Sequence, residues 1–319
     1  MSPELRILSV FLLTTCIYLN LNMFMKDETS KQPNAREKES RETTKWRNAN
    51  TNKVPVIYTF YSPKLNVKGE KKDDGYEHDK LVHVWKTLWK EAGWDPKVLT
   101  LDDAKKHPDF VKYSDILLNS IYPHLCDQCY DTLCFLRWLA MAAHGSGGWT
   151  SDYDTFPMGI TVETGINLPN NGRFTSYQVH IPALMSGSAE EWERVSHLVL
   201  DQVAIGKEGH LSDMMALKYV HDDDPESVLF EQRVFYGYPY KVNTIDKSNI
   251  VDCGILSEKN IWAIHLSHAS TEKDINDHRL HISSDGNGMH DRHSFAWEIS
   301  FLWKNECAPN LNLILGKIK

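Results

Sequence analysis

The sequence has little glycine, proline or cysteine and no excess of basic charge. Its 17 Gly, 13 Pro and 6 Cys are scattered over 319 residues of which 41% are hydrophobic and 24% charged, and these proportions exclude collagen-like, coiled-coil and wholly disordered chains. Lys and Arg number 35 against 43 Asp and Glu, and the net charge of −8 argues against nucleic-acid binding as the main function. Asn-x-Ser/Thr sites for N-glycosylation are absent. What remains is an ordinary folded protein, long enough for one large domain or two small ones.

The amino-terminal part contains one long uncharged segment. Ile7–Met25 is a run of 19 residues without a formal charge, bounded by Arg6 and Lys26. As a helix this run would span about 28 Å, the thickness of the hydrocarbon core of a bilayer. We interpret residues 7–25 as an uncleaved transmembrane signal anchor that follows a short cytoplasmic head, residues 1–6. A cleaved signal peptide with the apolar core Ile7–Leu13 is the alternative, although no small-x-small cleavage site follows it.

The segment that follows the anchor has almost no aliphatic residues. Residues 26–53 carry eight basic and five acidic side chains, which predicts a disordered, solvated stem before a globular domain at 54–319. Head, anchor, stem and domain in this order are typical of type II membrane enzymes of the secretory pathway. We therefore expect a single-pass protein of the Golgi or ER membrane with a luminal catalytic domain. In an oxidising lumen, the five cysteines beyond the anchor would allow two disulfides and one free thiol, with their pairing left open.

The first half of the globular domain alternates between strand and helix patterns. Val54–Tyr61 and Lys97–Leu101 read as strands, since they are short apolar runs rich in β-branched and aromatic residues. Apolar residues at helical spacing predict a helix from Leu81 to Gly93, and Asp102–His107 reads as a short second one. Asp131–His144 is apolar on nearly all sides and predicts a central, buried helix. This order predicts an α/β fold with a mixed, mainly parallel sheet and helices on both faces.

Later elements are predicted by the same criteria. Val179–Met185 and Ile261–His268 read as strands, the second of which ends in histidines. Glu190–Leu200 reads as a helix, and another begins after the capping residue Ser212.

Two carboxylates separated by one residue follow a glycine-rich turn. Gly145–Gly148 ends the central helix and lets the chain turn, and Thr150–Asp154 then reads as a strand end that carries Asp152 and Asp154. On an extended chain both side chains point to the same side. Hard oxygen ligands of this kind suit Mg²⁺ or Mn²⁺ at a diphosphate.

These residues carry a specific resemblance. Arg137-Trp138-Leu139-Ala140-Met141, followed by Gly147-Gly148-Trp149 and Asp152-Tyr153-Asp154, resembles the sugar-binding Asp-x-Asp region of GT-A glycosyltransferases, in particular the family of α-1,6-mannosyltransferases and α-1,4-galactosyltransferases. The resemblance implies a GT-A, Rossmann-like fold and a retaining, metal-dependent sugar transfer. It implies Mn²⁺ or Mg²⁺ as cofactor, a UDP- or GDP-sugar as donor, and a glycan hydroxyl on protein or lipid as acceptor.

The resemblance also implies roles for individual residues. Metal ligands would be Asp152, Asp154 and a late histidine, His265 or His268; both histidines equally suit an ordinary core or surface position. Donor-binding residues would be Tyr58, Thr59, Phe60, Arg137 and Asp152, and Asp213 is our candidate for the catalytic residue. Two departures from the family pattern stand out: an extra Gly-Ser in the turn, and Cys134 where an Asp usually precedes the arginine by three residues.

Three alternatives stay open at this stage. Asp152-x-Asp154-Thr155 also fits the nucleophile motif of haloacid-dehalogenase-type phosphatases, although the apolar strand that this motif requires is missing before Asp152. A membrane-tethered carbohydrate-binding domain without catalytic activity would show the same pattern. Arg137, in an otherwise apolar helix, could instead form a structural ion pair with Asp115 or Asp131.

Overall fold

A computed structural model describes residues 53–62, 74–127, 129–207, 209–242, 249–258, 260–277, 280 and 291–308. The predicted head, anchor and stem lie outside these residues, apart from Lys53. Within the described ranges, no helix combines the length and the hydropathy that a membrane span requires. All the elements named below belong to one of two compact units, Val54–Lys319.

The main sheet has six strands in the order β2-β1-β3-β6-β5-β7. Strand β1 pairs in parallel with β2 and β3, and β5 pairs in parallel with β7. Strand β6 lies antiparallel between β3 and β5, so the sheet is mixed, as predicted, with three parallel pairings out of five. The strands are β1 Val56–Phe60, β2 Asp95–Leu99, β3 Gly148–Ser151, β5 Thr175–Ser176, β6 Leu184–Gly187 and β7 Leu229–Phe230.

Two smaller sheets complete the strands of the described part. Strand β11 (Ala263–His265) pairs antiparallel with β4 (Thr155–Pro157) and parallel with β8 (Val234–Tyr236). Strands β9 (Tyr240–Val242) and β10 (Asn249–Val251) form an antiparallel ribbon. The chain between β3 and β4 therefore leads from the main sheet into the three-stranded one.

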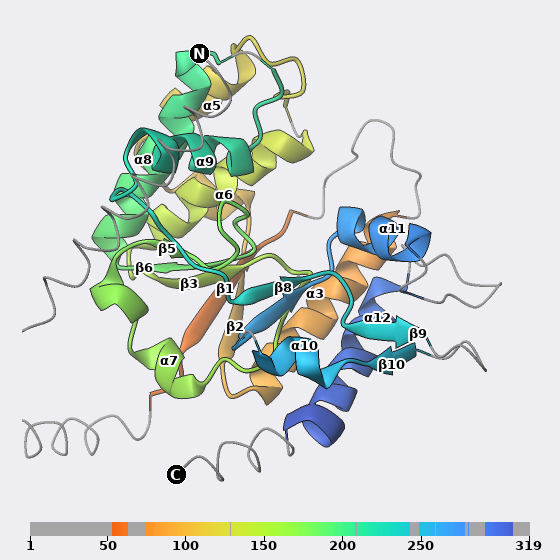
Figure 1. The fold of residues 1–319 in the computed structure, drawn as a ribbon. Helices are drawn as coiled ribbons and strands as arrows, with labels where there is room; N and C mark the ends of the chain where they lie inside the picture. Colours follow the sequence, from red (N-terminus) through yellow and green to blue (C-terminus); the bar gives the residue numbers. More distant parts are fainter. Residues whose placement is uncertain are drawn as a thin grey trace, which may run out of the picture. The chain divides into compact units, whose positions relative to one another are not determined.

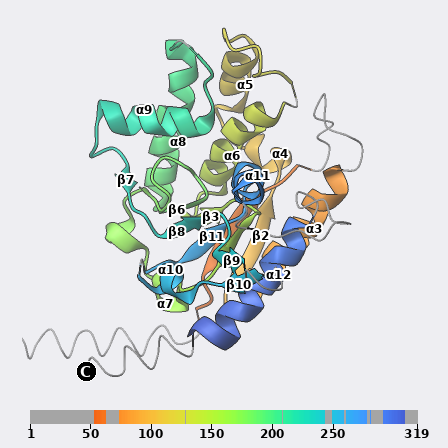
Figure 2. The same cartoon turned by 45° about the vertical axis from the view of Figure 1, so that its right-hand side comes forward.

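Helices cover both faces of the main sheet, as predicted. In Figures 1 and 2, α5, α6, α8 and α9 gather on one side, and α3 and α12 lie side by side on the other. The helices are α3 Asp74–Glu91, α4 Leu101–Ala104, α5 Phe110–Leu118, α6 Tyr130–His144, α7 Val162–Ile166, α8 Ala189–Ile205, α9 Asp213–Asp223, α10 Cys253–Glu258, α11 His268–Asn276 and α12 Arg292–Leu302.

Alternation along the strands divides the interior into two cores. In β1, Ile57 belongs to one core and the next residue, Tyr58, to the other; Leu184 and Met185 divide in the same way in β6. Tryptophans fill both cores. Six of the ten Trp side chains are less than 2% exposed, so these rings serve packing.

Two strand predictions are corrected in extent. Val179–Met185 is wrong as a strand, because only Leu184 and Met185 lie in β6. Val179 has φ 55°, and Ile181 N–H donates to the Gln178 carbonyl at 3.0 Å, so a turn precedes the strand. The predicted strand Ile261–His268 shortens to Ala263–His265, because the Ser267 hydroxyl accepts from the N–H of Ser270 and thereby starts α11.

The described cysteines form two disulfides and leave one free thiol, as the sequence would allow. Cys126 pairs with Cys129 and Cys253 with Cys307, and Cys134 is the free thiol among the described residues. The second disulfide joins the start of α10 to the end of the turn that follows α12.

Candidate functional site

Asp152 and Asp154 lie in the tight turn between β3 and β4. Backbone hydrogen bonds hold this turn from two directions: Asp152 N–H donates to the Ala183 carbonyl at 3.0 Å, and Leu266 N–H donates to the Asp154 carbonyl at 2.9 Å. A third bond, from Thr155 N–H to the Asp152 carbonyl at 3.0 Å, closes the turn itself. The turn sits at the carboxyl end of β3, the edge at which open α/β sheets bind ligands.

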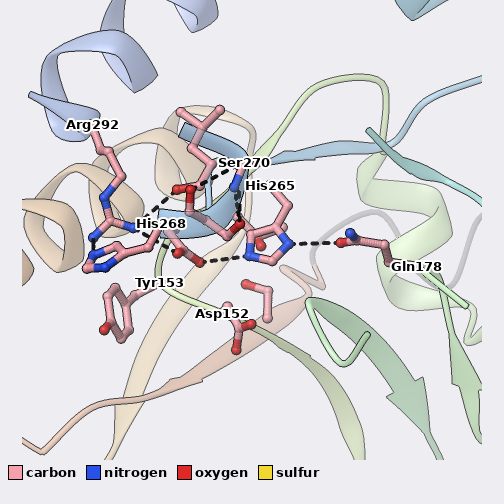
Figure 3. Close-up of polar contacts among 12 residues, drawn as sticks. Asp152, Tyr153, Gln178, His265, His268, Ser270 and Arg292 are labelled. Carbon is pink, nitrogen blue, oxygen red and sulfur yellow. Dashed lines mark hydrogen bonds and ion pairs between the residues drawn. The ribbon is translucent and has the colours of Figure 1, made fainter. Parts of the chain in front are cut away.

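His265, at the end of β11, completes a cluster with the two aspartates. One side-chain ligand atom each of Asp152, Asp154 and His265 lies within 4.8 Å of the other two, and His265 Nε2 is 3.4 Å from Asp154 Oδ1. Figure 3 shows Gln178 on the opposite side of the imidazole, where His265 Nδ1 donates to Gln178 Oε1 at 3.0 Å. This bond fixes the tautomer in which Nε2 carries the lone pair, the usual outer-shell arrangement of a metal-binding histidine.

The three groups influence each other's protonation. Burial by itself would raise the pKa of Asp154, but His265 and Arg292 outweigh it and lower the pKa to about 2. Burial raises the pKa of Asp152, against the opposing charge of Arg137. Burial disfavours the charged imidazole of His265, yet the two carboxylates raise its pKa above the usual value.

Arg137 on α6 links the first aspartate to α9. Its Nε donates to Asp213 Oδ2 at 3.0 Å, and its Nη1 pairs with Asp152 Oδ1. Trp138 Nε1 also donates to Asp213 Oδ2, at 3.1 Å. The alternative pairing of Arg137 with Asp115 or Asp131 is therefore wrong, and three predicted site residues meet in one network.

A buried arginine, Arg292 of α12, holds Asp154 from the other side. It is 1% exposed; its Nε donates to Glu77 Oε1 at 3.0 Å, and its Nη1 donates to Asp154 Oδ2 and to the Leu266 carbonyl, both at 3.2 Å. Sequence reasoning missed Arg292. The available signal was the one used for Arg137, a single arginine in a largely apolar helix.

His268 lies beside this arginine rather than in the three-residue cluster. Its Nε2 contacts Arg292 Nη2, and its ring stacks on His78 with 5.8 Å between the ring centroids (Figure 3 labels His268 and Arg292). Of the two predicted histidines, His265 is thus the one that the fold brings to both aspartates.

The predicted donor-binding residues of β1 divide between the two faces of the sheet. Tyr58 is buried, with its hydroxyl 3.1 Å from His144 Nε2, and Phe60 packs against the same core. Thr59 is fully buried, and its Oγ1 has no hydrogen-bond partner. The next residue, Tyr61, contacts Tyr153 of the aspartate turn, with 5.6 Å between the ring centroids.

Cys134 lies one turn before Arg137 on α6. Burial, together with the nearby charge of Asp213, raises the pKa of this thiol well above its usual value. The side chain is therefore neutral, and it supplies no carboxylate at this position.

The side chains of the cluster are suitable ligands for a divalent cation. Two carboxylates and an imidazole whose Nε2 faces them are oxygen and nitrogen ligands that suit Mn²⁺, whereas Mg²⁺ prefers oxygen ligands alone. Asp152, Asp154 and His265 are the residues that would hold the ion.

Comparison with known proteins yields a family match and a distant structural likeness. No curated protein matches the chain. The solved apo structure of mouse xyloside xylosyltransferase 1 is similar over 68% of this chain and 98% of that chain, with 11% sequence identity and a TM-score of 0.39. The profile of a family described as a domain of unknown function, DUF8765, matches residues 40–264, and the chain belongs to that family.

Proposed function

We propose that the chain is a metal-dependent glycosyltransferase that moves a sugar from a nucleoside diphosphate sugar to a glycan hydroxyl. The observation that carries the proposal is the convergence of Asp152, Asp154, His265 and Arg137 at the carboxyl end of β3. A cation bound there would neutralise charge that develops on the departing diphosphate. The donor class is a UDP- or GDP-sugar, the cofactor Mn²⁺ or Mg²⁺, and the acceptor a glycan on protein or lipid.

In this proposal Arg137 would bind phosphate, and two aspartates hold it in position. Asp213 and Asp152 hold the guanidinium of Arg137, whose planar fork is suited to phosphate oxygens. Because the Asp213 carboxylate is 3% exposed and bonded to Arg137 and Trp138, its contact here is a positioning one. Its direct role as the catalytic residue stays a prediction.

The cellular setting belongs to the same proposal. An anchor at residues 7–25 with a luminal domain would place the enzyme in the Golgi or ER membrane, where nucleotide sugars and glycan acceptors meet. A dehalogenase-type phosphatase is less well supported, because Asp152 pairs with Arg137 and follows Gly148-Trp149-Thr150-Ser151 rather than an apolar strand.

The test is a donor screen with the full-length chain in detergent. We expect Mn²⁺-dependent release or transfer of sugar from at least one UDP- or GDP-sugar. Asp154→Asn should abolish this activity while Asp102→Asn, which alters an exposed ion pair with Lys105, leaves it unchanged. Hydrolysis of simple phosphate esters with Mg²⁺ would favour the phosphatase, and glycan binding without donor turnover would favour the non-catalytic domain. Full activity in Asp154→Asn would contradict the proposal.

A further inference from the structure

An open cavity lies on the surface of the helix pair α3 and α12, outside the cluster described above. Its volume is about 390 Å³, within the range of about 300–1,000 Å³ that is common for small-molecule sites. The side chains that line it come from both helices: Asp79, Lys80, His83, Val84, His293 and Trp297. None of them is a predicted metal ligand or donor-binding residue.

The cavity lies near the end of the helix pair that meets the aspartate turn. Arg292, at the start of α12, pairs with Glu77 early in α3. Lys304, just after α12, pairs with Glu91 at the end of α3, so the two helices run in the same direction. Their starts meet at the site, because Arg292 Nη1 also donates to Asp154 Oδ2 at 3.2 Å. The lining side chains of α12 belong to the first half of that helix, close to this end.

One tyrosine joins the cavity to the aspartate turn. The Tyr61 hydroxyl donates to Asp79 Oδ1 at 2.7 Å, and the Tyr61 ring contacts the Tyr153 ring, with 5.6 Å between their centroids. Tyr153 is the middle residue of the Asp-x-Asp motif, and its hydroxyl lies 3.0 Å from Nδ1 of His78, the neighbour of Asp79 on α3. A molecule in the cavity would therefore be close to the aspartate turn, with Tyr61 between the two.

The cavity and the residue expected to bind phosphate lie on opposite flanks of the turn. Arg137 reaches Asp152 from α6, which covers one face of the main sheet. Arg292 reaches Asp154 from α12, which lies with α3 on the other face (Figures 1 and 2). A diphosphate bound by Arg137 would leave the flank of α3 and α12 to the second substrate of a transfer.

The lining side chains have the chemistry that a sugar ring requires. Trp297 is 38% exposed, whereas six of the ten Trp side chains are less than 2% exposed, so its indole can serve as an apolar platform. Asp79 has a second carboxylate oxygen, Oδ2, to accept from hydroxyls, and the exposed imidazole of His83 can donate or accept. A sugar presents an apolar C–H face together with a rim of hydroxyls, and both would find partners here.

We propose that this cavity binds one sugar ring of the acceptor glycan, with the ring packed on Trp297 and its hydroxyls bonded to Asp79 and His83. The assignment to the acceptor rests on the proposed function, whereas sugar binding at Trp297 can be measured without any turnover. The donor nucleobase and an apolar protein segment are the rival occupants, since either can pack on an exposed indole. The position beside α12 favours the acceptor, because Arg137 would hold the donor on the other flank of the turn.

The first experiment measures sugar binding to the full-length chain, without donor, in a detergent that has no sugar head group. The probes are the methyl glycosides of glucose, galactose, mannose, xylose and N-acetylglucosamine, and saturation-transfer NMR follows their binding. We expect at least one probe to bind, and Trp297→Ala to weaken that binding by at least about tenfold. Phe301→Ala is the matched control: Phe301 lies on the same helix, is 65% exposed and does not line the cavity, so this variant should bind as the unsubstituted chain does.

A second variant, His83→Ala, guards against misfolding. Its side chain is exposed, so the variant should keep the melting temperature and still weaken sugar binding by about threefold to tenfold. Once a donor is identified, Trp297→Ala should raise the KM for the acceptor by at least about tenfold and change kcat by less than about threefold. A failed donor screen beside sugar binding that depends on Trp297 would contradict the proposed function and support the sugar site.

The contrary outcomes separate the rival occupants. Absence of binding for every probe, or equal binding in Trp297→Ala and the unsubstituted chain, would overturn the proposal. A loss of UDP or GDP binding in Trp297→Ala, measured with Mn²⁺, would also overturn it, because the cavity would then hold the donor nucleobase. An equal loss of sugar binding in Phe301→Ala would overturn it as well, since the exposed face of α12 would then act as a general apolar surface.

Discussion

Arg137 on α6 and Asp213 on α9, 76 residues apart in the sequence, meet with 3.0 Å between Arg137 Nε and Asp213 Oδ2. The same guanidinium pairs with Asp152 of the aspartate turn. One largely buried cation thus ties two helices of one layer to the turn at the end of a strand.

Arg137→Lys should weaken nucleotide-sugar binding by about tenfold and cost about 1–3 kcal/mol of unfolding free energy. Lysine keeps the charge but cannot pair with both aspartates through a planar fork. Calorimetric titration with UDP or GDP in the presence of Mn²⁺ measures the affinity. Arg194→Lys is the control. Arg194 makes a two-point contact with the carboxylate of Glu191 on α8, but its side chain is 40% exposed. The control substitution should therefore change neither the affinity nor the stability by more than about 1 kcal/mol. Unchanged affinity with a large loss of stability would make Arg137 a structural residue only.

Arg292→Met should destabilise the fold by about 3–5 kcal/mol, because it removes the buried guanidinium that pairs with both Glu77 and Asp154. Urea unfolding followed by circular dichroism measures the change. Lys304→Met, which removes a half-exposed ion pair with Glu91 close to the same helix, should cost less than about 1 kcal/mol. Similar losses in the two variants would argue against the buried network.

The two disulfides should differ in their contribution to stability. Cys253 and Cys307 are 54 residues apart, and closing such a loop stabilises a fold by about 4 kcal/mol on chain-entropy grounds, against about 2 kcal/mol for the three-residue separation of Cys126 and Cys129. Replacing both cysteines of each pair by alanine and comparing melting temperatures tests this order. A larger loss for the short loop would contradict it.

Gly147→Ala should destabilise the protein more than Gly209→Ala. Both glycines have positive φ, 63° and 97°, so alanine costs about 1–3 kcal/mol at either position. Only at Gly147 would the new Cβ meet backbone, 2.5 Å from Ala189 N, whereas nothing lies within 4 Å at Gly209. This overpacking should add about 1–3 kcal/mol, which chemical denaturation can resolve. Equal losses would mean that the turn can relax.

Local pattern was enough to predict the elements that carry the site. The apolar run Asp131–His144 corresponds to α6 and the glycines end that helix, because helical spacing and left-handed turns depend on near neighbours. The predicted strand end Thr150–Asp154 is wrong in extent, because β3 stops at Ser151 and both aspartates lie in the turn that follows it. The prediction of a strand at Val179–Met185 is wrong. Its composition favours a strand, but the turn at Gln178–Ala183 is imposed by the chain around it.

The sequence by itself placed Asp152, Asp154 and His265 near strand ends and Arg137 within an apolar helix, and it restricted the metal chemistry to carboxylates and imidazole. Only the tertiary structure decided that Asp213 holds Arg137, that Arg292 holds Asp154, and that His265 rather than His268 faces both aspartates. These contacts join residues tens to hundreds of positions apart. They arise from the packing of helices on a mixed sheet, and no local periodicity encodes which charged groups that packing brings together.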